Sequence, residues 1–150
     1  MHPEGLALIG PAGLAALEAA PWGHDVTAIG GLTLGADPIS YAIAYASMLA
    51  REHAGDRAPL RAFTVRKEAK AHGTGKLIEG PFQPGDRVAV IEDVITTGGS
   101  ARRAIEAIRN AGGIVSGVLA LVDREEGGRE ALEALGVPVV ALVRASELGA

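Results

Sequence analysis

Short apolar runs alternate along the chain with longer segments in which apolar residues recur at helical spacing. The apolar runs predict buried strands over residues 25–30, 60–65, 88–91, 114–122 and 137–143. The segments with helical spacing are residues 6–20, 38–53, 101–111 and 129–135. Strands that alternate with helices are typical of a parallel sheet. The pattern therefore predicts an α/β fold, with a parallel sheet of about five strands and helices on both faces.

Two segments depart from this alternation. The first predicted helix contains Gly10 and Pro11, and a proline inside a helix removes one backbone hydrogen bond, so we expect a kinked or two-part helix over residues 6–20. Residues 67–81 contain glycines, several charges and little apolar periodicity. Long loops of this kind inside a compact domain are commonly functional, so we expect a mobile loop there.

Composition limits the class of protein. Apolar residues make up 48% of the 150 residues and aromatic residues only 3%, so the core must consist mainly of Ala, Leu, Val and Ile. The absence of cysteine excludes disulfides, thiolate catalysis and cysteine-based zinc sites. The net charge of −4 gives no overall basic field, so we expect no nucleic-acid partner.

The sequence also gives no sign of a membrane protein. No apolar run reaches the roughly 18 residues that a membrane-spanning helix needs. The N-terminus lacks the basic and apolar regions of a signal peptide. We therefore expect no membrane partner and a cytoplasmic location.

The densest set of chemically useful residues lies just after the third apolar run. Glu92 and Asp93 follow residues 88–91, where we expect the strand to end. A loop rich in glycine and hydroxyl groups comes next, and the predicted helix then starts at residue 101. This loop consists of Thr96, Thr97, Gly98, Gly99 and Ser100.

Such a junction is suited to binding a sugar phosphate. The first backbone N–H groups of a helix have no intrahelical partner, and the helix dipole places partial positive charge there, so a phosphate fits. Glycines let the backbone approach an anion closely. The two acids argue for a sugar, because carboxylates accept hydrogen bonds from vicinal hydroxyls. The alternative is an ordinary strand-to-helix connection with N-capping residues.

Two motifs together resemble a known family. Residues 92–100, EDVITTGGS, resemble the motif that binds phosphoribosyl diphosphate (PRPP) in type I phosphoribosyltransferases. Residues 66–75, RKEAKAHGTG, resemble the mobile catalytic loop of orotate phosphoribosyltransferases, although a solvated basic loop is the alternative for this segment alone. The resemblance implies a type I phosphoribosyltransferase fold in one domain over residues 1–150, with the catalytic loop at about 67–81.

The resemblance also implies roles for individual residues. The expected catalytic residues are Lys70, His72 and Asp93, with Lys70 stabilising charge on the leaving group. The expected PRPP ligands are Arg66, Lys67, Lys70, His72, Glu92, Asp93, Val94, Ile95, Thr96, Thr97, Gly98, Gly99 and Ser100. Thr96 and Arg124 match positions that contact orotate, and an ion pair of Arg124 with Asp123 or Glu125 is the alternative. The loop that follows the first strand, residues 31–37, matches a loop that touches the diphosphate, and a simple turn is the alternative.

The implied reaction is Mg²⁺-dependent transfer of the phosphoribosyl group from PRPP to orotate, a step of pyrimidine biosynthesis, with Mg²⁺ held mainly through PRPP. The implied partner is a second copy of the chain, because Arg66, Lys70 and His72 would reach into the neighbouring subunit's site. A purine or uracil phosphoribosyltransferase would share the first motif but not the second, and a non-catalytic PRPP-binding regulator would bind without turnover. A P-loop NTPase is disfavoured because no Gly-Lys-Ser/Thr follows the glycines.

The sequence departs from the family pattern in two places. Family members usually begin with a further segment that helps to cover orotate, and we expect this chain to lack it. Thr33 and Leu34 stand where many relatives carry a lysine. These departures bear on base recognition more than on PRPP binding.

Overall fold

A computed structural model describes residues 2–54, 58–69 and 76–149 of the chain. Its helices are α1 (Pro3–Ala19), α2 (Ala36–Ala54), α3 (Gly99–Asn110) and α4 (Gly128–Glu133), with a final 3-10 helix, η1 (Ala145–Leu148). Its strands are β1 (Ala28–Leu32), β2 (Arg61–Val65), β3 (Ile78–Glu79), β4 (Arg87–Ile95), β5 (Ile114–Asp123) and β6 (Val139–Arg144).

The strands form one six-stranded sheet in the order β3-β2-β1-β4-β5-β6. All neighbouring strands are parallel except β2 and β3, which pair antiparallel. The predicted α/β fold with a mostly parallel sheet is therefore confirmed. The short edge strand β3 was not predicted, because it lies inside the segment 67–81 that we expected to be a loop.

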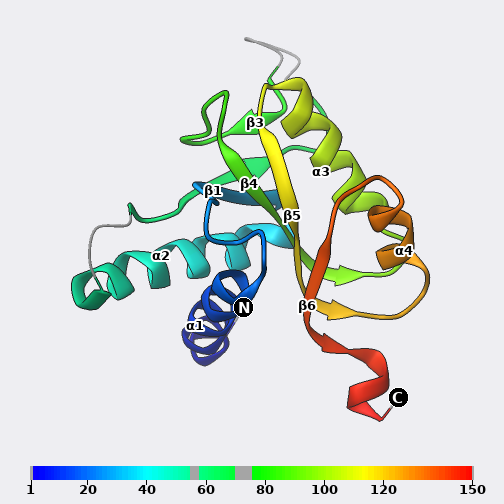
Figure 1. Ribbon diagram of the computed structural model, residues 1–150, viewed down its shortest axis with the longest axis horizontal. Helices are drawn as coiled ribbons and strands as arrows, with labels where there is room; N and C mark the ends of the chain where they lie inside the picture. Colours follow the sequence, from blue (N-terminus) through cyan, green and yellow to red (C-terminus); the bar gives the residue numbers. More distant parts are fainter. Residues whose placement is uncertain (1, 55–57, 70–75, 150) are drawn as a thin grey trace.

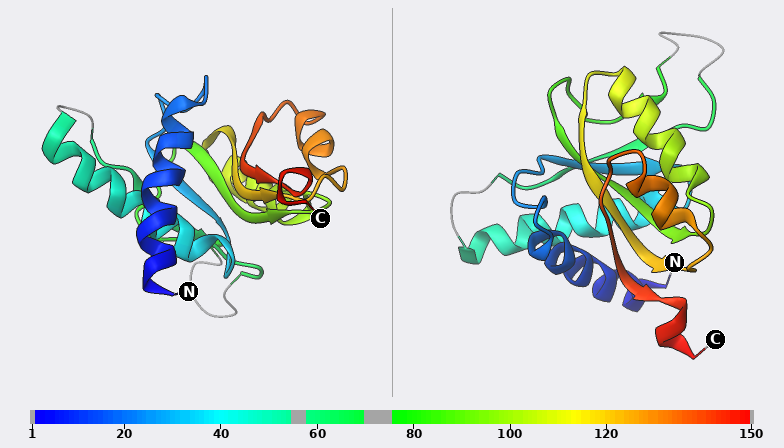
Figure 2. Two further views of the ribbon diagram at one scale, coloured as in Figure 1. Left: turned by 90° about the horizontal axis from the view of Figure 1, so that it is seen from below. Right: turned by 45° about the vertical axis from the view of Figure 1, so that its right-hand side comes forward.

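Helices cover both faces of the sheet. Figure 1 shows α1 and α2 on one side of the strands and α3 and α4 on the other, and the right view of Figure 2 shows the same arrangement. Each side has its own apolar cluster: residues of α1 and α2 pack on Ile29, Ile91 and Leu119, and residues of α3 and α4 pack on Val88 and Val90. Successive residues of β4 thus point to opposite sides of the sheet, as the period of a strand requires.

Two local expectations were wrong. The acid pair does not follow its strand, because β4 continues through both acids to Ile95 and pairs with β5 as far as Asp123. The two-part alternative for the first helix is wrong, since the helix runs through Pro11 as one element from Pro3 to Ala19, and residues on both sides of the proline, Gly10 and Leu14, are buried. No helix in the described part of the chain is both long and apolar enough to cross a membrane.

Candidate active site

The loop between β4 and α3 has the geometry of an anion site. Gly98 precedes α3 in the left-handed conformation, with φ of 80°, which favours glycine. Within the described residues, the structure records no acceptor for the backbone N–H groups of Thr96, Thr97 and Gly98. The first N–H groups of α3 have no intrahelical partner either. A row of backbone donors therefore meets the positive end of a twelve-residue helix.

A second glycine turn packs against this loop. A Cβ placed on Gly98 would lie 3.1 Å from the carbonyl oxygen of Gly128, and a Cβ on Gly128 would lie 2.4 Å from the carbonyl oxygen of Thr96. Side chains at either position would push the two turns apart. The turn that starts α4 therefore supports the β4–α3 loop, a contact that the sequence pattern did not reveal.

The two acids of β4 lie in different surroundings. Glu92 is 5% exposed, and burial, followed by the neighbouring charge of Asp93, raises the pKa of Glu92 from 4.5 to about 8. Asp93 is only partly buried, and one of its carboxylate oxygens accepts a hydrogen bond from the Val94 N–H at 2.8 Å. Glu92 is therefore neutral at neutral pH, and Asp93 is the more accessible acid beside the loop.

The loop between β1 and α2 meets Asp93. A Cβ placed on Gly35 would lie 2.6 Å from the Asp93 Oδ2 atom, so a larger residue would force this carboxylate to move. Leu34, at the tip of the loop, is 79% exposed. The structure thus brings the loop expected to touch diphosphate to the acid expected to bind ribose.

The ends of the expected catalytic loop are held by polar contacts. The Arg66 N–H donates to the Leu77 carbonyl at 2.8 Å, and the Arg66 guanidinium lies 3.5 Å from a carboxylate oxygen of Glu79 on β3. The Arg103 guanidinium donates to the Lys67 carbonyl at 2.7 Å. Lys70 and His72 lie outside the described residues. The pairing of Arg66 with Glu79 was not predicted, because it depends on the edge strand.

Arg124 follows β5 at the same end of the sheet. Its backbone N–H donates to the Ile95 carbonyl at 2.9 Å, which ties the turn to β4. Its exposed guanidinium lies 2.9 Å from a carboxylate oxygen of Glu126, so its ion pair is with neither Asp123 nor Glu125, the partners weighed from the sequence. An exposed pair of this kind is weak, so the guanidinium is available to a ligand.

A buried ion pair fixes the turn that carries Arg124. Asp123 is 1% exposed, and its carboxylate accepts hydrogen bonds from the Glu125 N–H at 2.9 Å and the Arg129 Nε at 2.8 Å. Burial by itself disfavours ionisation, but the Glu125 N–H and the Arg129 guanidinium outweigh it and hold the pKa of Asp123 below its ordinary value. Arg129 also donates to the Val139 carbonyl at 2.7 Å, so one side chain links β5, α4 and β6.

The structure therefore brings most of the expected residues together at the carboxyl ends of the parallel strands. Adjacent parallel strands bring together the acid pair, residues 96–100 and Arg124, and the β1–α2 loop touches Asp93. Ile95 differs, since its fully buried side chain belongs to the core and only its backbone faces the loop. Within the described part of the chain, no group of three or more His, Asp or Glu side chains could hold a metal ion.

A parallel sheet with a glycine-threonine anion loop after an acid pair defines a type I phosphoribosyltransferase. The chain is 51% identical over 146 residues to the orotate phosphoribosyltransferase of Aquifex aeolicus (strain VF5), covering 97% of this chain and 74% of that protein. It is 42% identical over 151 residues to the orotate phosphoribosyltransferase of Rhodopirellula baltica, covering 75% of that protein. The chain therefore belongs to the orotate phosphoribosyltransferase family, and it is a pentosyltransferase.

Solved structures agree with this assignment. The orotate phosphoribosyltransferase of Mycobacterium tuberculosis H37Rv in complex with Fe(III) dicitrate matches with a TM-score of 0.82 and 42% identity, covering 100% of this chain and 78% of that one. The same enzyme in complex with PRPP matches with a TM-score of 0.77 and 40% identity, covering 99% and 78%. An adenine phosphoribosyltransferase from Thermoanaerobacter pseudethanolicus, at 18% identity and a TM-score of 0.63, shares the fold alone. No protein-family model matches the chain.

Proposed function

We propose that this chain transfers the phosphoribosyl group from PRPP to orotate at the carboxyl ends of β1, β4 and β5. In this reaction a bond forms between a ring nitrogen of orotate and the anomeric carbon, and the bond from that carbon to diphosphate breaks. The products are orotidine 5'-phosphate and diphosphate. The observation that carries the proposal is the row of N–H groups before α3 that have no acceptor among the described residues, separated from Glu92 and Asp93 by two residues.

The sugar phosphate binds along the β4–α3 loop. Backbone N–H groups of residues 96–100 donate to the 5-phosphate, with the Thr97 and Ser100 hydroxyls as further donors. Asp93, the more exposed of the two acids, accepts hydrogen bonds from the ribose hydroxyls, and Glu92 supports it from its buried position. A fixed ribose lowers the entropic cost of reaching the transition state, in which positive charge develops on the ring.

The leaving diphosphate needs positive charge and backbone donors. The structure records no acceptor among the described residues for the N–H groups of Leu34 and Gly35, and Gly35 lies against Asp93. Lys67 supplies a cation from the end of β2. Arg66 follows the same strand, and in the proposal it reaches across from the neighbouring subunit together with Lys70 and His72, which lie outside the described residues.

Orotate binds beside the anion loop. Its carboxylate or a ring carbonyl accepts hydrogen bonds from Arg124, whose guanidinium presents a rigid fork of donors, and Thr96 lies on the adjacent strand end. Ligand binding here requires Arg124 to exchange its pair with Glu126. This exchange costs little, because the pair is largely exposed.

Magnesium is part of the proposal. The ion prefers oxygen ligands, keeps several waters and is commonly bound through phosphates and one or two carboxylates rather than a protein cage. The described residues fit this arrangement, since they offer the Asp93 carboxylate beside the loop and no three-residue metal cluster. When bound, Mg²⁺ neutralises charge on the leaving diphosphate.

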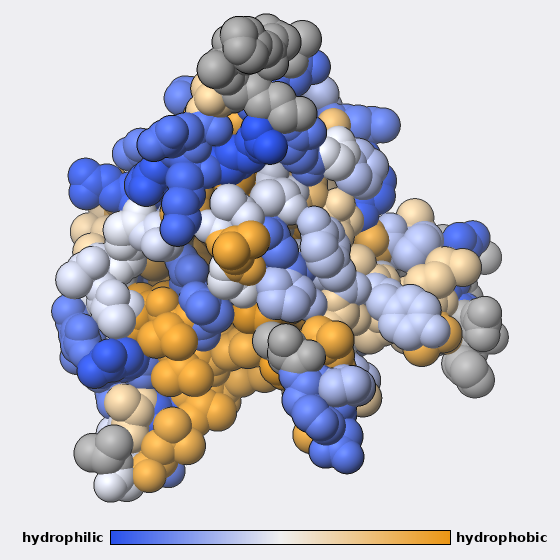
Figure 3. Space-filling view, turned by 180° about the vertical axis from the view of Figure 1, so that it is seen from behind, coloured by the Kyte–Doolittle hydropathy of each residue, from blue (hydrophilic) through white to orange (hydrophobic). Residues whose placement is uncertain are grey.

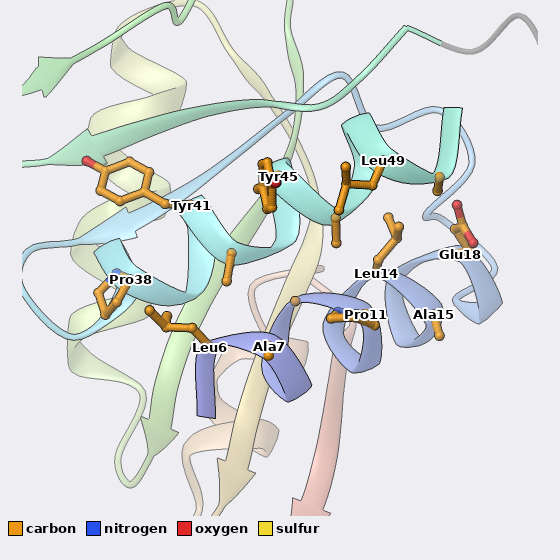
Figure 4. Close-up of a pocket in the computed structure, with 14 residues that line it drawn as sticks. Leu6, Ala7, Pro11, Leu14, Ala15, Glu18, Pro38, Tyr41, Tyr45 and Leu49 are labelled. Carbon is orange, nitrogen blue, oxygen red and sulfur yellow. The ribbon is translucent and has the colours of Figure 1, made fainter. Parts of the chain in front are cut away.

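We further infer a homodimer with shared active sites, working in the cytoplasm. A groove of about 960 Å³ runs between α1 and α2, lined mostly by apolar side chains such as Leu6, Leu14 and Tyr45, as Figure 4 shows. Figure 3 shows a broad area of apolar side chains exposed on one face of the molecule. A second copy seated on the groove would lie next to the catalytic edge, because Pro38 and Tyr41 at one end of the groove adjoin the β1–α2 loop.

The proposal is tested by following orotate absorbance with PRPP and Mg²⁺, beside uracil, adenine and hypoxanthine. We expect orotate to be consumed and the other three bases to remain unchanged.

Asp93→Asn should fold normally but lower kcat/KM by roughly a hundredfold, because the ribose loses a charged acceptor. Glu106→Gln, which removes an exposed carboxylate on α3 away from the loop, should retain full activity. Unchanged turnover in Asp93→Asn would remove this residue from the site, and PRPP binding without orotate consumption would indicate a regulator.

A further inference from the structure

A hydrogen-bonded chain of side chains supports the β1–α2 loop from outside the site. The loop lies against Asp93, as described above, but Leu34 at its tip has little packing to hold it. The Thr33 hydroxyl in this loop donates to the Asp37 Oδ2 atom at 2.6 Å. Asp37 belongs to the first turn of α2, so the helix anchors the loop that precedes it.

The other oxygen of the same carboxylate reaches the neighbouring strand. The Thr64 hydroxyl on β2 donates to the Asp37 Oδ1 atom at 2.9 Å. One carboxylate thus joins three elements: the loop after β1, the start of α2 and the end of β2. Thr64 lies two residues before Arg66, so this node also fixes the end of the strand that leads into the expected catalytic loop.

Tyr41 completes the chain. Its hydroxyl lies 2.8 Å from the Thr64 hydroxyl oxygen, and Figure 4 shows its side chain projecting from α2 away from α1. Thr64 has one hydroxyl proton, and it is donated to Asp37, so Tyr41 must donate to Thr64. The three groups therefore form a chain of hydrogen bonds, called the relay below, in which Tyr41 donates to Thr64 and Thr64 donates to Asp37. Each hydrogen bond of such a chain strengthens the next.

We propose that Asp37 is a positioning residue for PRPP and that the Tyr41 hydroxyl sets how firmly Asp37 holds the β1–α2 loop. The inference rests on the proposed function, which gives this loop the diphosphate as its ligand. Tyr41 itself touches neither substrate. Its loss leaves Thr64 and Asp37 freer to rotate, and the loop then spends less time in the conformation that binds PRPP.

Tyr41→Phe tests the relay, because it removes one hydroxyl and keeps the ring. Loss of one partly exposed hydrogen bond should raise the Kd and KM for PRPP about two- to tenfold. The KM for orotate and the association state should not change. Thr64→Val should give a similar rise, and the double variant should be no worse than the worse single variant, because both changes break the same chain.

Tyr45→Phe is the matched control. Tyr45 lies one turn further along α2, lines the same groove and is 67% exposed against 52% for Tyr41, but its hydroxyl makes no hydrogen bond with a described residue. It should bind PRPP as the wild type does. Equal PRPP affinity in Tyr41→Phe and Tyr45→Phe, or an equal loss for orotate and PRPP, would overturn the relay.

The same measurements separate this inference from the proposed function. If the wild type binds PRPP without consuming orotate, the proposed activity fails, and calorimetric PRPP affinities of the two tyrosine variants still decide the relay. If the wild type consumes orotate and Tyr41→Phe matches it in PRPP affinity, the relay alone fails. If the wild type binds no PRPP, both fail.

Discussion

Glu92 and Asp93 are neighbours in β4, but Glu92 is buried and Asp93 is only partly buried. Glu92 turns toward the interior, where no cation among the described residues pairs with it, and Asp93 turns toward the β1–α2 loop. Since its raised pKa of about 8 keeps Glu92 largely protonated, this residue adds little negative charge here at neutral pH. This lower charge favours binding of a polyanion such as PRPP at the same edge.

Glu92 makes the stability of the protein depend on pH. Its pKa rises from 4.5 to about 8 on folding, so between these values the folded chain holds a proton that the unfolded chain releases. The free energy of unfolding should therefore fall as pH rises through this window, by at most about 1.4 kcal/mol per pH unit. Glu92→Gln cannot lose a proton, so the variant should gain stability over the wild type steadily from pH 5 to pH 8.

Urea unfolding at several pH values in this range measures the difference. Glu106→Gln serves as the control, because it makes the same carboxyl-to-amide change at an exposed position of α3. A wild-type minus Glu92→Gln difference that stays constant from pH 5 to pH 8 would mean that Glu92 is ionised throughout.

At the scale of elements, two helices begin in the same way but serve different purposes. Gly98 before α3 and Gly127 before α4 both adopt left-handed backbone conformations, with φ of 80° and 88°. A Cβ on Gly98 would press on the turn of Gly128, whereas a Cβ on Gly127 would meet no atom within 4 Å. The two glycines are therefore a matched pair, one in the proposed phosphate loop and one outside it.

Gly98→Ala and Gly127→Ala should both lower the free energy of unfolding by about 1–2 kcal/mol, since alanine is strained in this conformation. Only Gly98→Ala should weaken PRPP binding, by about tenfold or more, because the displaced loop misdirects its N–H groups. Calorimetry of PRPP binding and urea unfolding of both variants provide the comparison. Equal PRPP affinities would show that the backbone of this loop does not bind the phosphate.

The elements and the anion loop were predictable because they depend on local signals. Apolar runs and helical periodicity gave the five parallel strands and the helices, and the glycine-hydroxyl loop identified the junction of β4 and α3. What the sequence could not predict depends on tertiary contacts. The edge strand β3 exists only because β2 offers it a partner, and the buried state of Glu92 depends on how far β4 continues.

The supporting residues were missed for the same reason. Asp37 directly precedes the predicted helix over residues 38–53, but it also binds a hydroxyl of the loop before it, Thr33, and one of a strand 27 residues away, Thr64. Arg129 begins the predicted helix over residues 129–135, but its side chain is largely buried in an ion pair with Asp123. The sequence does not predict either contact, because an aspartate before a helix and an arginine at the start of one are common without such partners.

At the scale of the whole molecule, the proposed active site and the α1–α2 groove are adjacent rather than opposite. The chain offers an acid pair, an anion loop and Arg124 at one edge, and a largely apolar groove that ends beside the β1–α2 loop. Exposure of these apolar side chains to water is unfavourable, and a second copy bound in the groove would bury them.

Mixing two inactive variants tests the shared site. If Lys70 acts in the partner's site and Asp93 in its own, a heterodimer of Lys70→Ala and Asp93→Asn contains one site with both changes and one with neither. Random reassociation of equal amounts should therefore restore about a quarter of the wild-type activity, because half of the dimers are mixed and half of their sites are intact. A mixture of Lys70→Ala and His72→Ala should stay inactive, since both changes lie on the exchanged segment and every site then receives a defective one. If each subunit instead uses its own loop, the first mixture will show no recovery, and the site must be complete within one chain.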